Sequence, residues 1–206
     1  MNSLIIHGCY DATTLKTLID FGINDFAFDL RGRSQNLISF KDLNELLKFV
    51  KNDRVFLTFE NDKIETIHSF LNLLSQHSKK FLLIFRDHQD ASFYAQIQNP
   101  FLWMFHPAGD WRAILALTNL KGMILPLKWQ DQYQKLPDLW KLIDARNLDV
   151  YLHAENFEES LHLELDENLK FSLDLSLEIE SGFRQVDQSK LKGMKIWRKL
   201  NESSAR

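Results

Sequence analysis

An α/β fold, a compact (β/α)8 TIM barrel in a single domain, is predicted for residues 1–200 of this 206-residue chain. Eight short β-rich runs alternate with longer amphipathic stretches along the sequence. Eight units in this length leave about 26 residues for each strand and its helix, as in a small barrel. No linker rich in Pro, Gly or Ser divides the chain, which indicates one domain.

Eight segments are predicted as strands because they are short and largely apolar. The run Phe81–Phe85 is apolar throughout, as expected of a parallel strand that is covered on both faces. In chain order the predicted strands are Leu4–His7, Asp25–Leu30, Arg54–Glu60, Phe81–Arg86, Phe101–His106, Gly122–Lys128, Asp149–Ala154 and Phe171–Ser176.

Helices are predicted between the strands, where apolar residues recur with helical spacing. Asp11 precedes one such stretch and Asp110 another, and aspartate in this position is a helix start signal. The predicted helices cover residues 11–21, 41–51, 63–77, 89–97, 110–119, 131–146, 156–162 and 188–199. Residues 201–206 form a polar C-terminal tail. A doubly wound open sheet is the competing architecture, since it is built from the same units.

Composition excludes several classes of protein. The net charge of −3 gives no reason to expect nucleic acid or a membrane surface as a partner, and no apolar run reaches the roughly 18 residues of a membrane span. The seven glycines form no GxGxxG or GxxxxGK[ST] pattern, so neither nucleotide binding by such loops nor a cofactor is expected. The single cysteine, Cys9, excludes an internal disulfide and a cysteine-rich zinc site. Residues 1–7 lack the pattern of a secretion signal, so we expect a cytoplasmic protein.

Ionisable residues stand at the C-terminal ends of the predicted strands, where barrel enzymes build their active sites. They are His7, Asp29, Glu60, Arg86, His106, Lys128, His153 with Glu155, and Asp174, which Ser176 follows. Because side chains alternate along a strand, about half of them point into the barrel mouth. We therefore expect His7, His106, His153 and Asp174 on one rim, around a small-molecule ligand.

Two of these residues have a chemical and a structural interpretation, and both stay open. His7 is a candidate general base or metal ligand, or a hydrogen-bonded histidine of the rim. As a rim residue it would make few core contacts, so His7→Ala is expected to lower the free energy of unfolding by about 1 kcal/mol or less. Lys128 is a candidate partner for a phosphate or carboxylate, or a solvated lysine.

Four segments carry motifs of a known enzyme family. They are Ile5–Tyr10, Gly22–Leu30 with Ser34-Gln35-Asn36 after it, Val55–Glu60, and Leu173–Glu180 with Gly182–Asp187 after it. In order they are similar to K-x-C-G-[IL]-T, G-A-D-x-x-G-F-x-F with S-x-R, V-G-V-F-V-N, and D-V-S-S-G-V-E with G-x-K-D. The chain resembles phosphoribosylanthranilate isomerase, a small (β/α)8 isomerase of tryptophan biosynthesis. The resemblance spans nearly the whole chain and is strongest at its two ends.

The resemblance implies an Amadori-type aldose–ketose isomerisation, but the residues that perform it in the family differ here. His7 stands in place of the catalytic cysteine, the general base. Pro126 stands near the place of the aspartate that is the general acid, so no carboxylate is found there. Asn36 replaces a substrate-binding arginine, for which the nearby Arg33 is a substitute.

The two glycines that bind the substrate phosphate in the family are replaced by Glu155 and Glu178. Each replacement brings a negative charge toward a phosphate dianion, and such charges within ~5 Å disfavour binding by several kcal/mol. The residues assigned to substrate or ligand binding are Arg33, Ser34, Asn36, Arg86, His106, His153, Glu155, Asp174, Ser176 and Glu178. Those assigned to catalysis, where it is retained, are His7, Asp29 and Lys128.

Three functions are compatible with these observations. The first is a barrel of this family that has lost catalysis and binds a ligand. The second is an active sugar-phosphate isomerase, with His7 as base and Lys128 or Asp29 as acid. The third is a metal-dependent hydrolase, with one cation held by His7, His106, His153 and Asp174 and with Glu155 close by.

Overall fold

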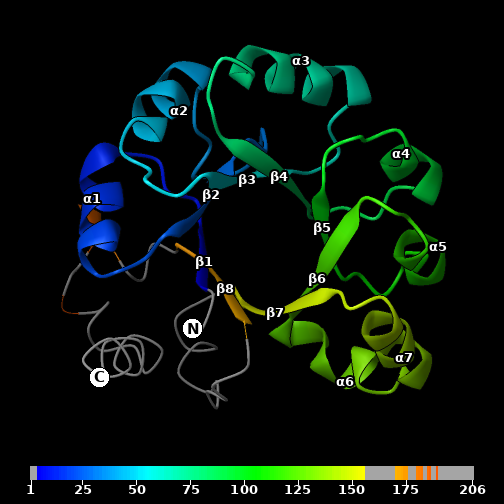
Figure 1. Ribbon diagram of the computed structural model, residues 1–206. Coiled ribbons are helices and arrows are strands. Elements are labelled where there is room, and N and C mark those ends of the chain that lie inside the picture. The colour runs from blue at the N-terminus through cyan, green and yellow to red at the C-terminus, as the bar shows by residue number, and fades with distance from the viewer. Residues whose placement is uncertain (1–3, 156–169, 176–179, 183–184, 187–188, 190–206) are drawn as a thin grey trace.

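The computed structural model, which describes residues 4–155, 170–175, 180–182, 185–186 and 189, is a closed barrel of eight parallel strands (Figure 1). The strands are β1 Leu4–His7, β2 Asp25–Asp29, β3 Arg54–Phe59, β4 Lys80–Phe85, β5 Phe101–Met104, β6 Leu120–Pro126, β7 Asp149–Ala154 and β8 Lys170–Asp174. Each strand pairs with the next in the chain, and β8 pairs with β1 to close the barrel. The TIM-barrel prediction is confirmed, and the alternative of an open sheet is wrong.

Helices surround the barrel on its outside (Figure 1). They are α1 Ala12–Asp20, α2 Phe40–Leu47, α3 Ile64–Leu74, α4 Ala91–Ala95, α5 Trp111–Leu115, α6 Gln130–Tyr133, α7 Pro137–Ala145 and a 3-10 helix, η1, Leu127–Trp129. The predicted start signals are confirmed, since the Asp11 side chain accepts hydrogen bonds at the start of α1 and the Asp110 side chain does so at the start of α5.

The structure differs from the predicted boundaries in the region after β6. The predicted strand Gly122–Lys128 ends at Pro126, and Lys128 belongs to η1. The predicted helix over residues 131–146 is two helices, because Pro137 has no N–H to donate and begins α7. An antiparallel pair that the sequence did not predict follows β8, β9 Glu180–Gly182 and β10 Gln185–Val186.

Several predicted features fall on the remaining parts of the chain. The helix over 156–162, nearly all of the helix over 188–199, the tail 201–206 and the site residues Ser176 and Glu178 lie outside the described residues. Within the described residues, no helix is long and apolar enough to cross a membrane.

The hydrophobic core has two parts, one inside the barrel and a larger one between the strands and the helices. The interior part contains Ile5 on β1, Phe56 on β3 and Tyr151 on β7. Because side chains alternate, the residues two positions later on these strands, His7, Thr58 and His153, continue the interior face toward the C-terminal end. The barrel interior therefore changes from apolar to polar as it approaches the mouth.

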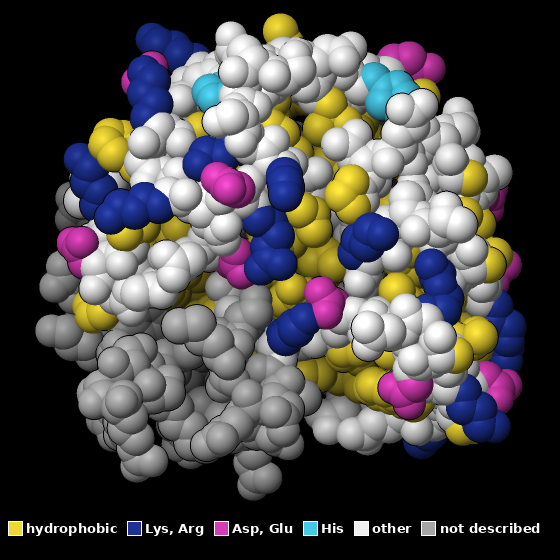
Figure 2. Space-filling model, viewed as in Figure 1, with side chains coloured by type: hydrophobic (Ala, Val, Ile, Leu, Met, Phe, Trp, Pro, Cys, Tyr) yellow, Lys and Arg dark blue, Asp and Glu magenta, His cyan; other side chains and the backbone are white. Residues whose placement is uncertain are grey.

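Ion pairs join neighbouring strands at the N-terminal end of the barrel, opposite the mouth. Arg54 lies 2.5 Å from Asp25, and Lys170 pairs with Asp149. On the face shown in Figure 2, basic and acidic side chains are interspersed rather than separated by sign. These pairs lie at the N-terminal ends of the strands. In barrels of this kind, the residues at that end contribute to stability, whereas the catalytic residues lie at the C-terminal end.

Candidate functional site

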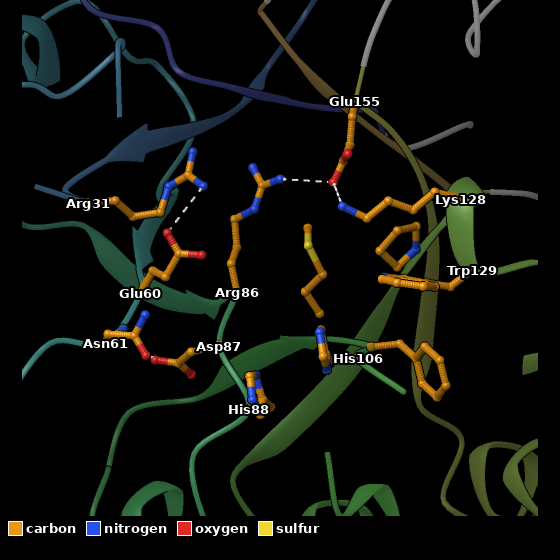
Figure 3. Close-up of a pocket in the computed structure, with 13 residues that line it drawn as sticks. Arg31, Glu60, Asn61, Arg86, Asp87, His88, His106, Lys128, Trp129 and Glu155 are labelled. Atoms are coloured by element: carbon orange, nitrogen blue, oxygen red, sulfur yellow. Dashed lines mark hydrogen bonds and ion pairs between the residues drawn. The ribbon is translucent and has the colours of Figure 1, made fainter. Parts of the chain in front are cut away.

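A cavity of about 280 Å³ opens at the C-terminal ends of the strands (Figure 3). Its lining consists of Arg31, Glu60, Asn61, Arg86, Asp87, His88, Met104, Phe105, His106, Pro126, Lys128, Trp129 and Glu155. Residues from the ends of β3, β4, β5, β6 and β7 contribute to it, which is how a barrel of this kind assembles a site from separate parts of the chain.

One side of the pocket is organised around Arg31. Its guanidinium donates two hydrogen bonds to the Asp29 carboxylate, at 2.8 and 2.5 Å. The Ser34 hydroxyl donates a third to the same carboxylate at 2.6 Å, and Glu60 lies 3.8 Å from Arg31. The Asp29 carboxylate is therefore engaged by its neighbours rather than directed at the cavity.

A second group of charges lies around Arg86, at the end of β4. Its side chain is 8% exposed, and it donates hydrogen bonds of 3.0 and 2.7 Å to the two oxygens of Asp174. Glu155 Oε1 lies 3.6 Å from Arg86 and 2.6 Å from the Lys128 ammonium (Figure 3). The Glu155 carboxylate thus lies between two cations at the mouth.

The lower wall of the pocket in Figure 3 is aromatic. The rings of His88 and His106 are stacked, with centroids 4.3 Å apart and planes 10° apart. The Trp129 ring is inclined by 72° to the His106 ring, with the two ring centroids 5.8 Å apart. Partial burial lowers the pKa of His106, and the nearby His88 and Lys128 lower this pKa further.

Below the pocket, a buried polar cluster fills the barrel interior. The Ser172 hydroxyl lies 2.5 Å from His7 Nε2 and 2.9 Å from His153 Nδ1, and because it has a single proton it accepts a hydrogen bond from at least one of the two rings. His153 Nε2 lies 3.7 Å from Asp174, which joins this cluster to Arg86. Within the described residues, two buried side-chain polar atoms have no hydrogen-bond partner, His7 Nδ1 and Thr58 Oγ1.

Burial and charge shift two pKa values in this cluster. Burial lowers the pKa of His7 well below its ordinary value, and it outweighs the opposing effect of the Asp174 carboxylate. Burial alone would raise the pKa of Asp174, but His153 and Arg86 hold that pKa well below its usual range. The cluster therefore holds a neutral His7 and an ionised Asp174 at neutral pH.

The structure brings together only part of the predicted site. Arg86, His106, Lys128 and Glu155 line the pocket as expected. The other predicted residues that the structure describes are not among its lining residues. The Asp29 carboxylate pairs with Arg31 and accepts from Ser34, Asn36 donates to the Leu175 carbonyl at 2.9 Å, and Arg33 is exposed. His7, His153 and Asp174 belong to the cluster below.

The expectation that His7 is a rim residue with few contacts is wrong. Its exposed fraction is 2%, its Nε2 atom is hydrogen-bonded to Ser172, and its ring lies 5.3 Å from that of His153. We expect His7→Ala to lower the free energy of unfolding at pH 8 by about 2 kcal/mol, because it removes a buried hydrogen bond and leaves a cavity. Chemical denaturation measures this loss, with His68→Ala at an exposed position of α3 as the control; equal stability of the two variants would contradict it.

Sequence reasoning missed several lining residues, notably Arg31, Asn61, Asp87, His88 and Trp129. Asn61 has a positive φ of 58°, and its N–H donates to the Asp87 carboxylate at 2.7 Å. The Tyr94 hydroxyl donates to the same carboxylate at 2.5 Å. The five missed lining residues lie two or three positions beyond a strand end, where turn geometry decides which side chain faces the mouth.

The metal-site hypothesis receives no support from the part of the chain that the structure describes. Within that part, no group of three or more His, Cys, Asp or Glu side chains is arranged to hold a metal ion. His7, His153 and Asp174 do lie together, but Ser172 bonds both rings and Arg86 bonds the carboxylate. His106 lies apart from them, in the aromatic wall.

Comparison with solved structures places this barrel among known proteins. The phosphoribosylanthranilate isomerase of Thermotoga maritima superposes with a TM-score of 0.68 and 15% identity, over 98% of this chain and 100% of that chain. The chain has the phosphoribosylanthranilate isomerase fold. The phosphoribosylanthranilate isomerase of Thermus thermophilus superposes with a TM-score of 0.65 and 17% sequence identity, over 100% of both chains. Neither a family model nor a curated protein matches the sequence.

A third phosphoribosylanthranilate isomerase structure, in complex with reduced 1-(o-carboxyphenylamino)-1-deoxyribulose 5-phosphate, has a TM-score of 0.67 and 14% identity. It covers 92% of this chain and 94% of that chain. The resemblance to phosphoribosylanthranilate isomerases that the sequence motifs indicated is therefore confirmed for the fold. At such identities activity has to be argued from the site itself.

Proposed function

We propose that this protein is a re-purposed, non-catalytic relative of phosphoribosylanthranilate isomerase whose barrel mouth binds a small molecule. The observation that carries the proposal is the position of Glu155, with its carboxylate between Arg86 and Lys128. In the resembled family a glycine at this place leaves room for the phosphate of the substrate. Here the Glu155 carboxylate forms ion pairs with both cations, in the place that the phosphate would need.

The charge of the family's ligand conflicts with this mouth. The ligand of the complexed neighbour carries a phosphate and a carboxylate. Two unit charges of like sign about 5 Å apart repel by on the order of 3 kcal/mol at an effective dielectric constant of 20, before screening by salt. A phosphate near Glu155 meets this repulsion, and displacing Glu155 breaks its pair with Lys128.

The pocket also offers no suitably placed general acid or general base among its described candidates. A general base has to come within about 3 Å of the proton that it removes, and His7 is buried below the pocket and hydrogen-bonded to Ser172. Pro126 lines the pocket where the resemblance places the general acid. The remaining candidates, Asp29 and Lys128, are engaged in ion pairs.

Turnover of phosphoribosylanthranilate tests the proposal. We expect the purified protein to convert it at least about 10⁴-fold more slowly than the Thermotoga maritima enzyme in the same assay, since acid–base groups contribute roughly 10²–10⁴-fold and phosphate anchoring adds to this. The chain should also fail to rescue a tryptophan auxotroph that lacks the isomerase, under conditions where the Thermotoga enzyme rescues it. Rescue by this chain would show instead an active isomerase with His7 as base.

A further inference from the structure

Each basic side chain that the structure describes around the pocket is paired with a carboxylate. The ion pairs are Arg31 with Asp29 and Glu60, Arg86 with Asp174 and Glu155, and Lys128 with Glu155. An anionic ligand therefore has to displace a carboxylate. The lining contains as many carboxylates (Glu60, Asp87 and Glu155) as Arg and Lys side chains, and the Asp87 carboxylate, which is in none of these ion pairs, accepts hydrogen bonds from Asn61 and Tyr94. This balance favours a ligand without net charge.

The aromatic wall indicates the shape of such a ligand. His88 and His106 are stacked 4.3 Å apart, and Trp129 stands beside them in the same lining (Figure 3). Aromatic rings pack well against a further planar ring, and the indole of Trp129, with the Lys128 ammonium 5.7 Å from its ring centroid, adds a second flat surface to the lining. The cavity of about 280 Å³ lies at the lower end of the size range of ligand sites, which fits a ligand of one or two rings.

The hydrogen bonding of His106 adds polarity to this wall. The backbone N–H of Ala108 donates to His106 Nδ1 at 3.2 Å, so Nδ1 carries no proton. A neutral imidazole with this tautomer has its proton on Nε2, which makes His106 a hydrogen-bond donor. Because this N–H lies in the plane of the His106 ring, it is complementary to an acceptor nitrogen or oxygen of a ligand at the edge of that ring rather than over its face.

We propose that the pocket binds an uncharged, planar heteroaromatic molecule of one or two rings, stacked against the wall formed by His88, His106 and Trp129. This inference rests on the proposed function, because it names the class of ligand for the same pocket. It differs from the ligand of the solved neighbour, which carries a carboxylate and a phosphate.

Calorimetric titration at pH 8 with matched probes tests the proposal. The uncharged probes are imidazole, benzimidazole and adenine, and the anionic probes are benzimidazole-5-carboxylate and inorganic phosphate. We expect benzimidazole or adenine to bind at least about tenfold more tightly than the carboxylate and phosphate. The proposal is wrong if no uncharged probe binds more tightly than the anionic probes. Such a result leaves the proposed function standing, whereas turnover of phosphoribosylanthranilate would overturn that function whichever probe binds.

Variants of the wall and of Glu155 separate stacking from charge. Trp129→Ala and His106→Ala should each weaken binding of the uncharged ring about tenfold, which is typical of a lost stacking partner. Trp129→Phe keeps a ring and should retain most of the affinity, while His68→Ala on α3 should change nothing. Glu155→Gln should tighten binding of benzimidazole-5-carboxylate about tenfold and leave benzimidazole within about twofold. Equal affinity of the wall variants and the unmodified protein would contradict the proposed stacking.

Discussion

Replacing Arg86 with methionine is expected to lower the free energy of unfolding by about 3–5 kcal/mol, the loss typical when one partner of a buried ion pair is removed. Arg86 is 8% exposed and donates two hydrogen bonds to Asp174. Without them, Asp174 keeps its charge and, among the described residues, retains the ion pair with His153 at 3.7 Å. Urea denaturation at pH 7 measures the change.

Lys128→Met provides the matched control for this substitution. Its ion pair with Glu155 joins side chains that are 44% and 29% exposed, and pairs in such positions contribute about 0–1 kcal/mol. A second variant, Arg86→Met with Asp174→Asn, removes the uncompensated charge and should recover part of the lost stability. If Arg86→Met is no more harmful than Lys128→Met, the buried pair does not hold the cluster together.

The stability of the protein is expected to fall as the pH is lowered from 7 to 5. His7 has a pKa well below its ordinary value of about 6.5 in the folded state, so the unfolded chain binds a proton in this range that the folded chain does not. The stability that depends on a neutral His7 is fully present above pH 6.5, and it is lost as the pH falls from there through the pKa of His7 in the folded state. His7 alone makes the free energy of unfolding decrease by up to about 1.4 kcal/mol for each unit by which the pH falls in this range.

Denaturation curves at several pH values test the contribution of His7. His7→Gln keeps a polar side chain but cannot titrate, so its slope between pH 7 and 5 should be smaller than that of the unmodified protein. His68→Ala should keep the full slope. Asp174 adds a second loss at lower pH, below about 3.9, because its folded pKa is also lowered. An unchanged slope in His7→Gln would assign the effect to another histidine.

The fold was predictable because the barrel repeats one local pattern. Apolar runs such as Phe81–Phe85 need cover on both faces, and each is followed by an amphipathic stretch that provides it. The start of a helix at Asp11 follows from its local chemistry. The break at Pro137 was also present in the sequence, as a residue that cannot donate inside a helix.

The site was predictable only as far as strand ends define it. Arg86 and Lys128 face the pocket as expected, but the alternation that predicts facing says nothing about depth along the barrel axis. The sequence therefore predicts His7 at the rim, whereas the structure places it in the buried cluster, hydrogen-bonded to Ser172. His88 and Trp129 were missed because they follow the strand ends, where the chain has left the regular pleat.

The two carboxylates of Arg86 have unequal consequences for how this protein can evolve. Asp174 neutralises Arg86 inside the barrel, so a change at Asp174 affects folding as well as binding. Glu155 is partly exposed and reaches the same guanidinium from the mouth, so it can be exchanged without leaving a buried charge unpaired. A single substitution at Glu155 thus changes the charge of the mouth, while Arg86 keeps its buried partner Asp174. Of the two carboxylates that share Arg86, the one at the mouth is therefore the one whose replacement leaves the buried pair of Arg86 with Asp174 in place.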